Sequence, residues 1–391
     1  TTPGSPISLS QGADNKTGTD GNDTFNGFLD GGSATFQGTL DTVDGGAGTD
    51  TLVAYGLTGA NTLTNVKNVE VITVRTGSTA ATVDVSTASG FTSLTGAKLV
   101  NQASAAALDY LKVGSVSPAV GVQGATADMG VVHTAIAVAG AADSLTIEVD
   151  GYKPTGDGVG ETANDGSGLV LQAGIETLAV VSSGGESNFK IFTDNLTDGT
   201  TGDDTNGYSS ATTLTVTGSA KTTIGHAMTG LKTIDLSKST GGVSVDNTGG
   251  STQLAVTGGT GADTLTITTA NLDKAASTKD SINLGDGTDT LKLAADAIST
   301  ANWTAFVDAA NSVVTNTETL SFMGKSINNG GAELASIDLS VFTNGLKNFT
   351  FGATSTTGAN GSANIAITGL STANTLTFDA NTTGNTGTTT G

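Results

Sequence analysis

The chain has 391 residues, a formal net charge of −21 and no cysteine. The sequence has only 15 basic residues against 36 acidic ones, so it offers no basic patch to neutralise phosphates. This composition excludes nucleic acid as a partner. No run of about 18 apolar residues marks a transmembrane segment, and 56 glycines with only 4% aromatic residues predict a core of small stacked side chains.

The acidic residues are mostly Asp, since only seven of the 36 are Glu. Asp favours turns and calcium loops, whereas Glu paired with Lys is typical of helical surfaces. We expect about half of these Asp residues to be ordinary solvated turn residues. The abundance of Thr and Val favours strands. Without disulfides, bound calcium is one source of stability, because a ligand that binds only the folded state stabilises it.

The first recognisable unit follows a segment, residues 1–11, that we interpret as a linker. Residues 18–26 read Gly-Thr-Asp-Gly-Asn-Asp-Thr-Phe-Asn, a degenerate form of a nonapeptide that binds calcium in β-helices. Asp14 lies nine residues before Asp23. The predicted calcium ligands of this unit are Asp14, Asp20 and Asp23.

Residues 45–53 are the strongest signal in the chain. They fit the calcium-binding nonapeptide Gly-Gly-x-Gly-x-Asp-x-U-x, in which U is apolar, at every fixed position. The glycines permit φ > 0 and close approach of carbonyl oxygens to an ion, and Asp50 adds a carboxylate. We expect Leu52 to point into the coil. The predicted ligands here are Asp41, Asp44, Gly46, Gly48 and Asp50.

A second motif has the form [Asn/Gly]-x-[Glu/Lys]-x-apolar-x-apolar. It occurs at residues 68–74, 174–180, 230–236, 316–322 and 345–351. Each copy predicts a turn residue followed by a period-2 strand. The intervals are irregular, so the sequence predicts a decaying array of stacked rungs rather than a unique globular topology.

The nonapeptide returns in complete form at residues 258–266, and residues 284–292 lack only its first Gly. Asp280 lies nine residues before Asp289, as Asp41 does before Asp50. The predicted ligands are Gly259, Gly261, Asp263, Asp280, Asp286 and Asp289. Residues 299–314 are the one predicted helix, with a Ser or Thr cap and apolar residues at helical spacing.

The sequence favours a protein that is not an enzyme. His133 and His226 are its only histidines, and neither a His-Glu-x-x-His helix nor a Gly-x-Ser-x-Gly elbow is present. Paired carboxylates for glycoside hydrolysis stay open in so Asp-rich a chain. A β-helix enzyme that degrades polysaccharides is therefore one alternative, and an extracellular adhesin or glycan-binding protein is another.

Residues 18–25, 44–52 and 68–74 together resemble the RTX-type surface-layer proteins of Gram-negative bacteria. The resemblance is strong over residues 14–95 and 255–325. It implies export by type I secretion, guided by a C-terminal signal, and calcium-dependent assembly into two-dimensional lattices outside the cell. In that family a separate N-terminal region attaches the lattice to lipopolysaccharide. Neither that region nor the secretion signal is recognisable here, so we expect a mature product or a trimmed fragment.

We therefore expect an all-β fold, mainly right-handed parallel β-helix or stacked-rung β-solenoid, with calcium-binding turns and one short helix. Residues 12–250 and 251–380 are predicted to form two related lobes, followed by a flexible tail at 381–391. The predicted function is structural: a calcium-dependent, self-assembling surface-layer or sheath protein at the cell surface. Its partners would be further copies of itself and, through calcium, lipopolysaccharide.

Overall fold

The computed structural model describes residues 3–86, 96–100, 109–114, 119–126, 129–133, 140–154, 168–194, 207–225, 228–248, 250, 253–268, 280–294, 314–322, 336–338, 346–352, 366–369 and 372–379. These residues form strands and turns, and none of them is helical. The predicted helix at 299–314 lies outside the described residues except for Val314, which begins a strand. No helix long and apolar enough to cross a bilayer is found in the described part of the chain.

The chain divides into two compact units, Thr1–His226 and Ala227–Gly391. The strands of the first unit are β1 (Pro3–Ser8), β2 (Asn15–Thr17), β3 (Asn22–Gly27), β4 (Leu29–Asp30), β5 (Ser33–Ala34), β6 (Thr42–Asp44), β7 (Thr51–Thr62), β8 (Val66–Lys67), β9 (Val71–Asp84), β10 (Gly96–Val100), β11 (Asp109–Val113), β12 (Ala119–Gln123), β13 (Met129–His133), β14 (Ser144–Asp150), β15 (Gly168–Gln172), β16 (Thr177–Ser183), β17 (Ser187–Asp194), β18 (Thr213–Gly218) and β19 (Thr222–Gly225).

The second unit contains β20 (Thr233–Ser239), β21 (Val243–Asp246), β22 (Ala255–Thr257), β23 (Thr264–Ile267), β24 (Ser281–Asn283), β25 (Thr290–Leu293), β26 (Val314–Thr315), β27 (Thr319–Phe322), β28 (Ser336–Asp338), β29 (Asn348–Gly352), β30 (Ala366–Thr368) and β31 (Thr375–Asp379).

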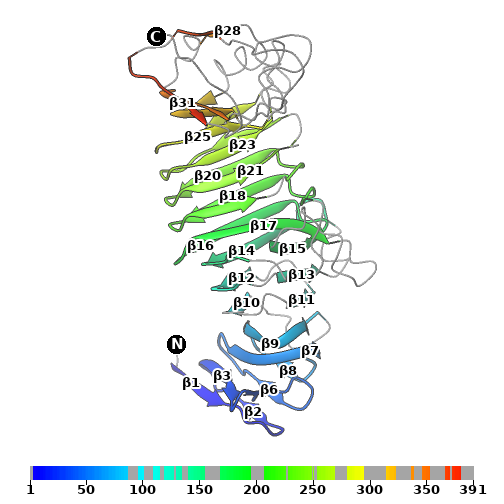
Figure 1. Ribbon diagram of the computed structural model, residues 1–391. Helices are drawn as coiled ribbons and strands as arrows, with labels where there is room; N and C mark the ends of the chain where they lie inside the picture. The colour runs from blue at the N-terminus through cyan, green and yellow to red at the C-terminus, as the bar shows by residue number, and fades with distance from the viewer. Residues whose placement is uncertain are drawn as a thin grey trace. The chain divides into compact units, whose positions relative to one another are not determined.

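Within each unit the strands stack in parallel, as in a β-helix (Figure 1). In the first unit β14 pairs with β12 and β16, while β15 pairs with β13 and β17. In the second, β22 pairs with β24, while β23 pairs with β25. Each coil, here called a rung, thus gives one strand to each of two stacks. This pattern confirms the predicted all-β solenoid.

Columns of apolar side chains fill the interior; most are aliphatic, as the composition predicts, but several Phe and Tyr side chains are also fully buried. In the first unit Phe25, Leu52 and Ile72 occupy equivalent positions on successive rungs, and all three are fully buried. In the second, Leu265, Leu291 and Leu320 form the corresponding column. Burying one such side chain stabilises the fold by about 1.5–3 kcal/mol. Leu52 therefore points into the coil, as expected.

The N-terminal segment differs from the expected linker, because Pro3–Ser8 is strand β1, paired in parallel with β3. Proline cannot donate a ladder hydrogen bond and is confined to edge strands. An edge position on the first rung explains how Pro3 and Pro6 are tolerated there. The Gly-rich insertion that follows β3 forms the short antiparallel hairpin β4–β5.

Candidate functional site: glycine turns closed by carboxylates

Four nonapeptide turns occupy equivalent corners of the solenoid rungs. In the first unit residues 18–23 lead from β2 into β3, and residues 45–50 lead from β6 into β7. In the second unit residues 258–263 lead from β22 into β23, and residues 284–289 lead from β24 into β25. Because the flanking strands pair in register, the two turns of each unit lie directly on one another.

Close backbone contact between the stacked turns of the first unit requires glycine. A Cβ on Gly45 would lie 1.7 Å from the carbonyl oxygen of Asn68, and a Cβ on Gly48 would lie 2.6 Å from that of Gly21. Gly46 and Gly48 also have left-handed φ angles of 94° and 129°. Positive φ, one of the two reasons that the sequence suggested for these glycines, therefore applies, and close packing of adjacent rungs is a further reason.

In the second unit, positive φ and close packing both apply to the incomplete copy of the nonapeptide, since a Cβ on Gly285 would lie 2.3 Å from the Gly259 carbonyl oxygen. Only close packing applies to the complete copy. Gly285 and Gly287 of the incomplete copy have left-handed φ angles of 88° and 152°. The φ angles of Gly259 and Gly261, in the complete copy, lie outside the left-handed range. Their Cβ atoms would instead lie 2.3 Å from the Ser239 carbonyl oxygen and 2.5 Å from that of Gly241. Glycine is needed at 259 and 261 for close approach alone.

A ladder of carboxylates runs along the stacked turns of the first unit. The backbone N–H of Asp23 donates to Asp50 Oδ1 at 2.7 Å, and the N–H of Asp50 donates to Glu70 Oε2 at 2.8 Å. Each carboxylate thus satisfies a backbone donor of the preceding rung at a corner where the strand ladder is interrupted.

The second unit repeats this ladder. The Asp263 N–H donates to Asp289 Oδ1 and the Asp289 N–H to Glu318 Oε2, both at 2.8 Å. The two units therefore share one local design: two Asp turns followed by a Glu.

The second sequence motif closes each ladder. Asn68 and Asn316, with φ of 52° and 51°, are the non-glycine residues with positive φ in the described part of the chain. In each case this left-handed residue lies two positions before the Glu that accepts the N–H of Asp50 or Asp289. The motif predicts only a turn and a strand, and neither Glu is among the predicted site residues. Their recurrence after Asp50 and Asp289 was the available signal.

A third copy of the motif makes the same contact in the middle of the first unit. The Asp143 N–H donates to Glu176 Oε2 at 2.9 Å, two residues after Gly174, whose φ is 105°. Here no complete nonapeptide precedes the Glu. The carboxylate-to-backbone bond is therefore a general corner device of this solenoid.

Two carboxylate oxygens in these ladders have no hydrogen-bond partner. Asp50 and Asp289 are fully buried, yet Oδ2 of each is unpaired, whereas their Oδ1 atoms accept the ladder bonds. By contrast, Asp23 accepts from the Ser5 N–H at one oxygen and from Thr19 at the other. A buried carboxylate oxygen without a partner costs several kcal/mol unless a proton or a cation compensates it.

Within the described part of the chain, no Lys or Arg offsets the charge of Asp50 or Asp289. Burial raises the pKa of Asp289 to about 6, and the charges of Asp263, Glu318 and Asp286 act in the same direction. Burial, together with the carboxylate of Glu70, likewise raises the pKa of Asp50.

Asp44, in the same turn region as Asp50, differs, because its ion pair with Lys67 at 2.9 Å and a hydrogen bond from Asn68 lower its pKa. Lys67 thus compensates Asp44 but not Asp50.

The remaining predicted ligands lie elsewhere. Asp41 and Asp280 are buried at the opposite end of the short strands β6 and β24, about 10 Å from the turns at 3.3 Å per strand residue. Asp41 accepts the backbone N–H groups of Asp14 and Gln37, and Asp280 accepts that of Leu254. These residues cap a second corner. Three further predicted ligands are at or near the surface: Asp14 is half-buried, and Asp20 and Asp286 are exposed.

The residues present fit a calcium ion held mainly by backbone oxygens. The described residues contain no group of three or more His, Cys, Asp or Glu side chains arranged to hold a metal. Ca²⁺ does not need one, because it accepts backbone carbonyls together with few carboxylates. Around Asp50 and Asp289, glycines leave carbonyl oxygens of adjacent rungs unobstructed by any Cβ, next to a buried carboxylate oxygen that lacks a partner.

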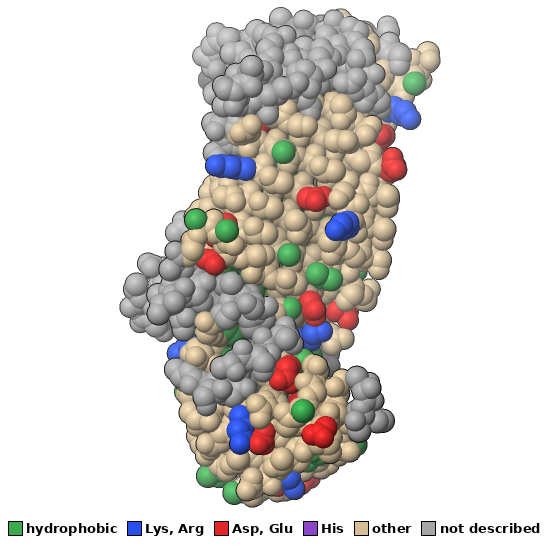
Figure 2. All heavy atoms as spheres, turned by 180° about the vertical axis from the view of Figure 1, so that it is seen from behind, with side chains coloured by type: hydrophobic (Ala, Val, Ile, Leu, Met, Phe, Trp, Pro, Cys, Tyr) green, Lys and Arg blue, Asp and Glu red, His purple; other side chains and the backbone are tan. Residues whose placement is uncertain are grey.

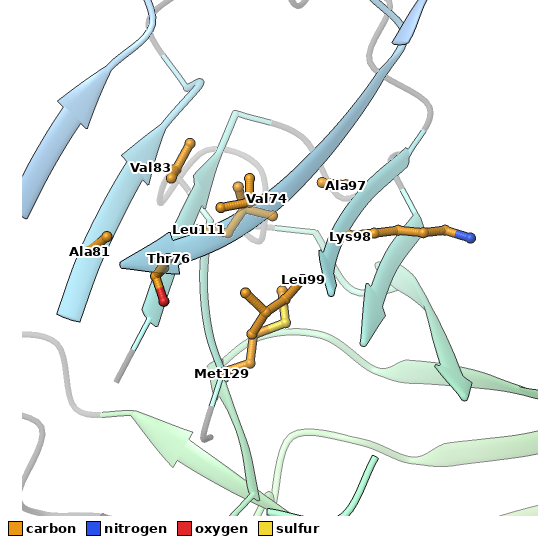
Figure 3. Close-up of a pocket in the computed structure, with 9 residues that line it drawn as sticks. All are labelled: Val74, Thr76, Ala81, Val83, Ala97, Lys98, Leu99, Leu111 and Met129. Atoms are coloured by element: carbon orange, nitrogen blue, oxygen red, sulfur yellow. The ribbon is translucent and has the colours of Figure 1, made fainter. Parts of the chain in front are cut away.

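The first unit also contains an apolar pocket between β9, β10, β11 and β13 (Figure 3). It is lined by Val74, Thr76, Ala81, Val83, Ala97, Lys98, Leu99, Leu111 and Met129. None of these nine residues carries a carboxylate, and the Lys98 ammonium extends away from the others to pair with Glu148 at 2.6 Å. This pocket gives no support to acid–base hydrolysis of a glycan.

A scan against protein-family models finds no match to the chain, and a search of curated proteins finds none either.

Proposed function

We propose that the chain is a structural protein that assembles with copies of itself, in the presence of calcium, into a surface layer or sheath outside a Gram-negative bacterial cell. The observation that carries this proposal is the pair of unpartnered, fully buried oxygens, Asp50 Oδ2 and Asp289 Oδ2, in equivalent glycine turns of the two units. The resemblance of the nonapeptides to RTX-type surface-layer proteins supplies the biological setting.

Calcium would join adjacent rungs. In the first unit Asp50 Oδ2 and backbone carbonyls of turns 18–23 and 45–50 would hold an ion, and in the second unit Asp289 Oδ2 and turns 258–263 and 284–289 would do so. The ion would supply the positive charge that the described neighbouring side chains do not. Without it, ionised Asp50 lies near Glu70, and ionised Asp289 near Glu318. We therefore propose that calcium orders these turns outside the cell, and that low calcium inside keeps the chain exportable by type I secretion.

The surface is consistent with a packing role. On the face shown in Figure 2, uncharged polar side chains and backbone make up most of the described surface, with acidic and basic side chains scattered among them. Copies that each carry a net charge of −21 repel one another at low salt. Divalent cations would reduce this repulsion between copies, and would in the same way bridge the chain to anionic lipopolysaccharide.

Electron microscopy of the purified protein with calcium and with EGTA tests the proposal. We expect ordered arrays only with calcium, and none from the double variant Asp50→Asn/Asp289→Asn. The matched control, Asp20→Asn/Asp286→Asn, removes the same charge from exposed positions and should still assemble. A monomer that binds glycans without forming arrays would favour an adhesin. Turnover of a polysaccharide, abolished by one Asp→Asn change that preserves folding, would favour an enzyme.

A further inference from the structure

An aromatic cluster lies on three successive rungs of the first unit, with Phe28 exposed and Tyr55 and Arg75 half-buried. The ring of Phe28 meets the ring of Tyr55 edge to face, with centroids 5.4 Å apart and planes at 64°. The Arg75 guanidinium lies over the Tyr55 ring, 6.0 Å from its centroid. Tyr55 pairs in register with Arg75 between β7 and β9, so the stack follows the solenoid axis. We call Phe28, Leu29, Tyr55 and Arg75 the Tyr55 surface.

A bulge in β7 shapes this surface. The register of β7 shifts between Tyr55 and Leu57, and Gly56 within that bulge has a left-handed φ of 83°. The Leu29 side chain occupies the space next to Gly56, where a Cβ would lie 2.4 Å from Leu29 Cδ2. A bulge of this kind redirects side chains and is common beside functional sites.

The hairpin that carries Phe28 and Leu29 is fixed in place. Gln11 Nε2 donates to the Asp30 carbonyl oxygen at 2.9 Å, and the Thr35 N–H donates to that of Phe28 at 3.2 Å. Nevertheless Phe28 is 48% exposed and Leu29 is 42% exposed. Large apolar side chains are otherwise rarely exposed in the described part of the chain, where only Leu40 and Val181 join them. Rigid, exposed apolar groups next to an Arg have the composition of a protein-interface hot spot.

The positive charge of Arg75 indicates that the Tyr55 surface binds an acidic partner. Arg75 is the single arginine of a chain with net charge −21. In the described residues each of the five ion pairs uses a lysine, and Arg75 takes part in none of them. Its planar guanidinium, stacked on Tyr55, therefore keeps a fork of donors suited to bidentate binding of a carboxylate.

A second copy of this chain presents such carboxylates in excess. Because the Tyr55 surface runs across successive rungs along the solenoid axis, a copy docked on it makes a lateral contact.

We propose that the Tyr55 surface docks an acidic segment of a second copy of this chain, with Arg75 binding a carboxylate and Phe28 and Leu29 covered at the contact. This inference rests on the proposed self-assembling function and names one of its contacts. It assigns the lateral interface to the bulge and hairpin of the first unit.

Sedimentation of the whole chain in calcium tests the contact. We expect Arg75→Glu and, separately, Phe28→Ser to weaken self-association at least tenfold. Lys232→Glu, which makes the same charge change at an exposed lysine of the second unit, should change it less than twofold. The wild type and the three variants must give the same circular dichroism spectrum as one another in calcium, and likewise in calcium-free buffer. Self-association of Arg75→Glu and Phe28→Ser equal to that of the wild type would overturn the docking proposal alone. A wild type that stays monomeric in calcium would overturn the proposed function and the docking with it.

A single introduced thiol gives an independent readout, because the chain has no cysteine. Leu29→Cys should react with a maleimide in the calcium-free monomer and become at least tenfold slower to react in the assembly. Ongoing rapid labelling in the assembly contradicts the proposal. Protection of the thiol by added polysaccharide but not by assembly would identify a glycan as the occupant instead.

Discussion

Replacing Asp289 with Asn should have opposite effects on stability with and without calcium. In the wild type the Asp263 N–H donates to Asp289 Oδ1 at 2.8 Å, and the Asn side chain keeps an oxygen that can accept this bond. Its amide nitrogen takes the place of the unpartnered Oδ2. In calcium-free buffer the substitution removes a buried negative charge that lies near Asp263, Glu318 and Asp286. Without calcium the variant should therefore be more stable than the wild type.

The magnitude follows from the pKa of Asp289. A rise from 3.8 to about 6 is roughly two pKa units, or about 3 kcal/mol at 1.36 kcal/mol per unit. Although Asp289 is fully buried, residues 286–288 of its turn are exposed and screen the charge, so we expect about 1–2 kcal/mol. At roughly 2–4 °C per kcal/mol, the calcium-free Tm should rise by a few degrees.

With calcium the order should reverse. A calcium concentration a hundredfold above Kd stabilises the wild type by about 2.7 kcal/mol, and the variant loses that gain at its second-unit turn. Thermal melts at pH 8 in EGTA and in calcium measure both effects, and Asp286→Asn is the matched control in the same turn. A variant that is less stable than the wild type in EGTA, or that gains as much from calcium, refutes the reasoning.

Further predictions follow from the same contacts. In EGTA, the pKa of Asp289 is higher in the folded state, at about 6, than its value of 3.8 in the unfolded state. The stability gained from the protonated side chain is therefore fully present below pH 3.8 and is lost as the pH rises through about 6. Melts between about pH 4 and 7 should show stability falling with pH in the wild type, and a smaller slope in Asp289→Asn. Glu70→Ala leaves the buried Asp50 N–H without its acceptor and should lower stability by about 1–3 kcal/mol, while Glu70→Gln retains most of it. Gly48 has a φ of 129° and packs against Gly21, so Gly48→Ala should lower the free energy of unfolding by more than about 1 kcal/mol and weaken calcium binding. An unchanged calcium affinity in titration calorimetry would contradict the proposed stacking of turns. Leu52→Ala should cost about 2–5 kcal/mol by opening a cavity in the column, and denaturant unfolding measures that loss.

The solenoid architecture could be predicted, because its strands and corners follow from short local sequence patterns. Thr51-Leu52 alternates between an outward and an inward position, and the nonapeptide fixes a corner before it. Stacking such units in parallel is the available way to bury their apolar residues, so the solenoid could be predicted. Pro3–Ser8 could not, because the prolines that suggest a linker are also compatible with an edge strand.

The site was harder to predict, because spacing along the chain does not show which carboxylates are satisfied by backbone donors. Asp41 and Asp50 look equivalent in sequence, nine residues apart. In the structure both oxygens of Asp41 accept backbone N–H groups, whereas Asp50 keeps one oxygen unpaired. Glu70 belongs to a motif that reads as a strand start, and only the close approach of two rungs brings it to Asp50.

The count of calcium ions bound per chain tests the central claim most directly. Equilibrium dialysis with radioactive calcium should show that Asp50→Asn and Asp289→Asn each remove at least one ion. The double variant should lose both, together with the rise in Tm that calcium gives the wild type. An unchanged number of bound ions in the double variant, or a wild type that binds none, would contradict the account.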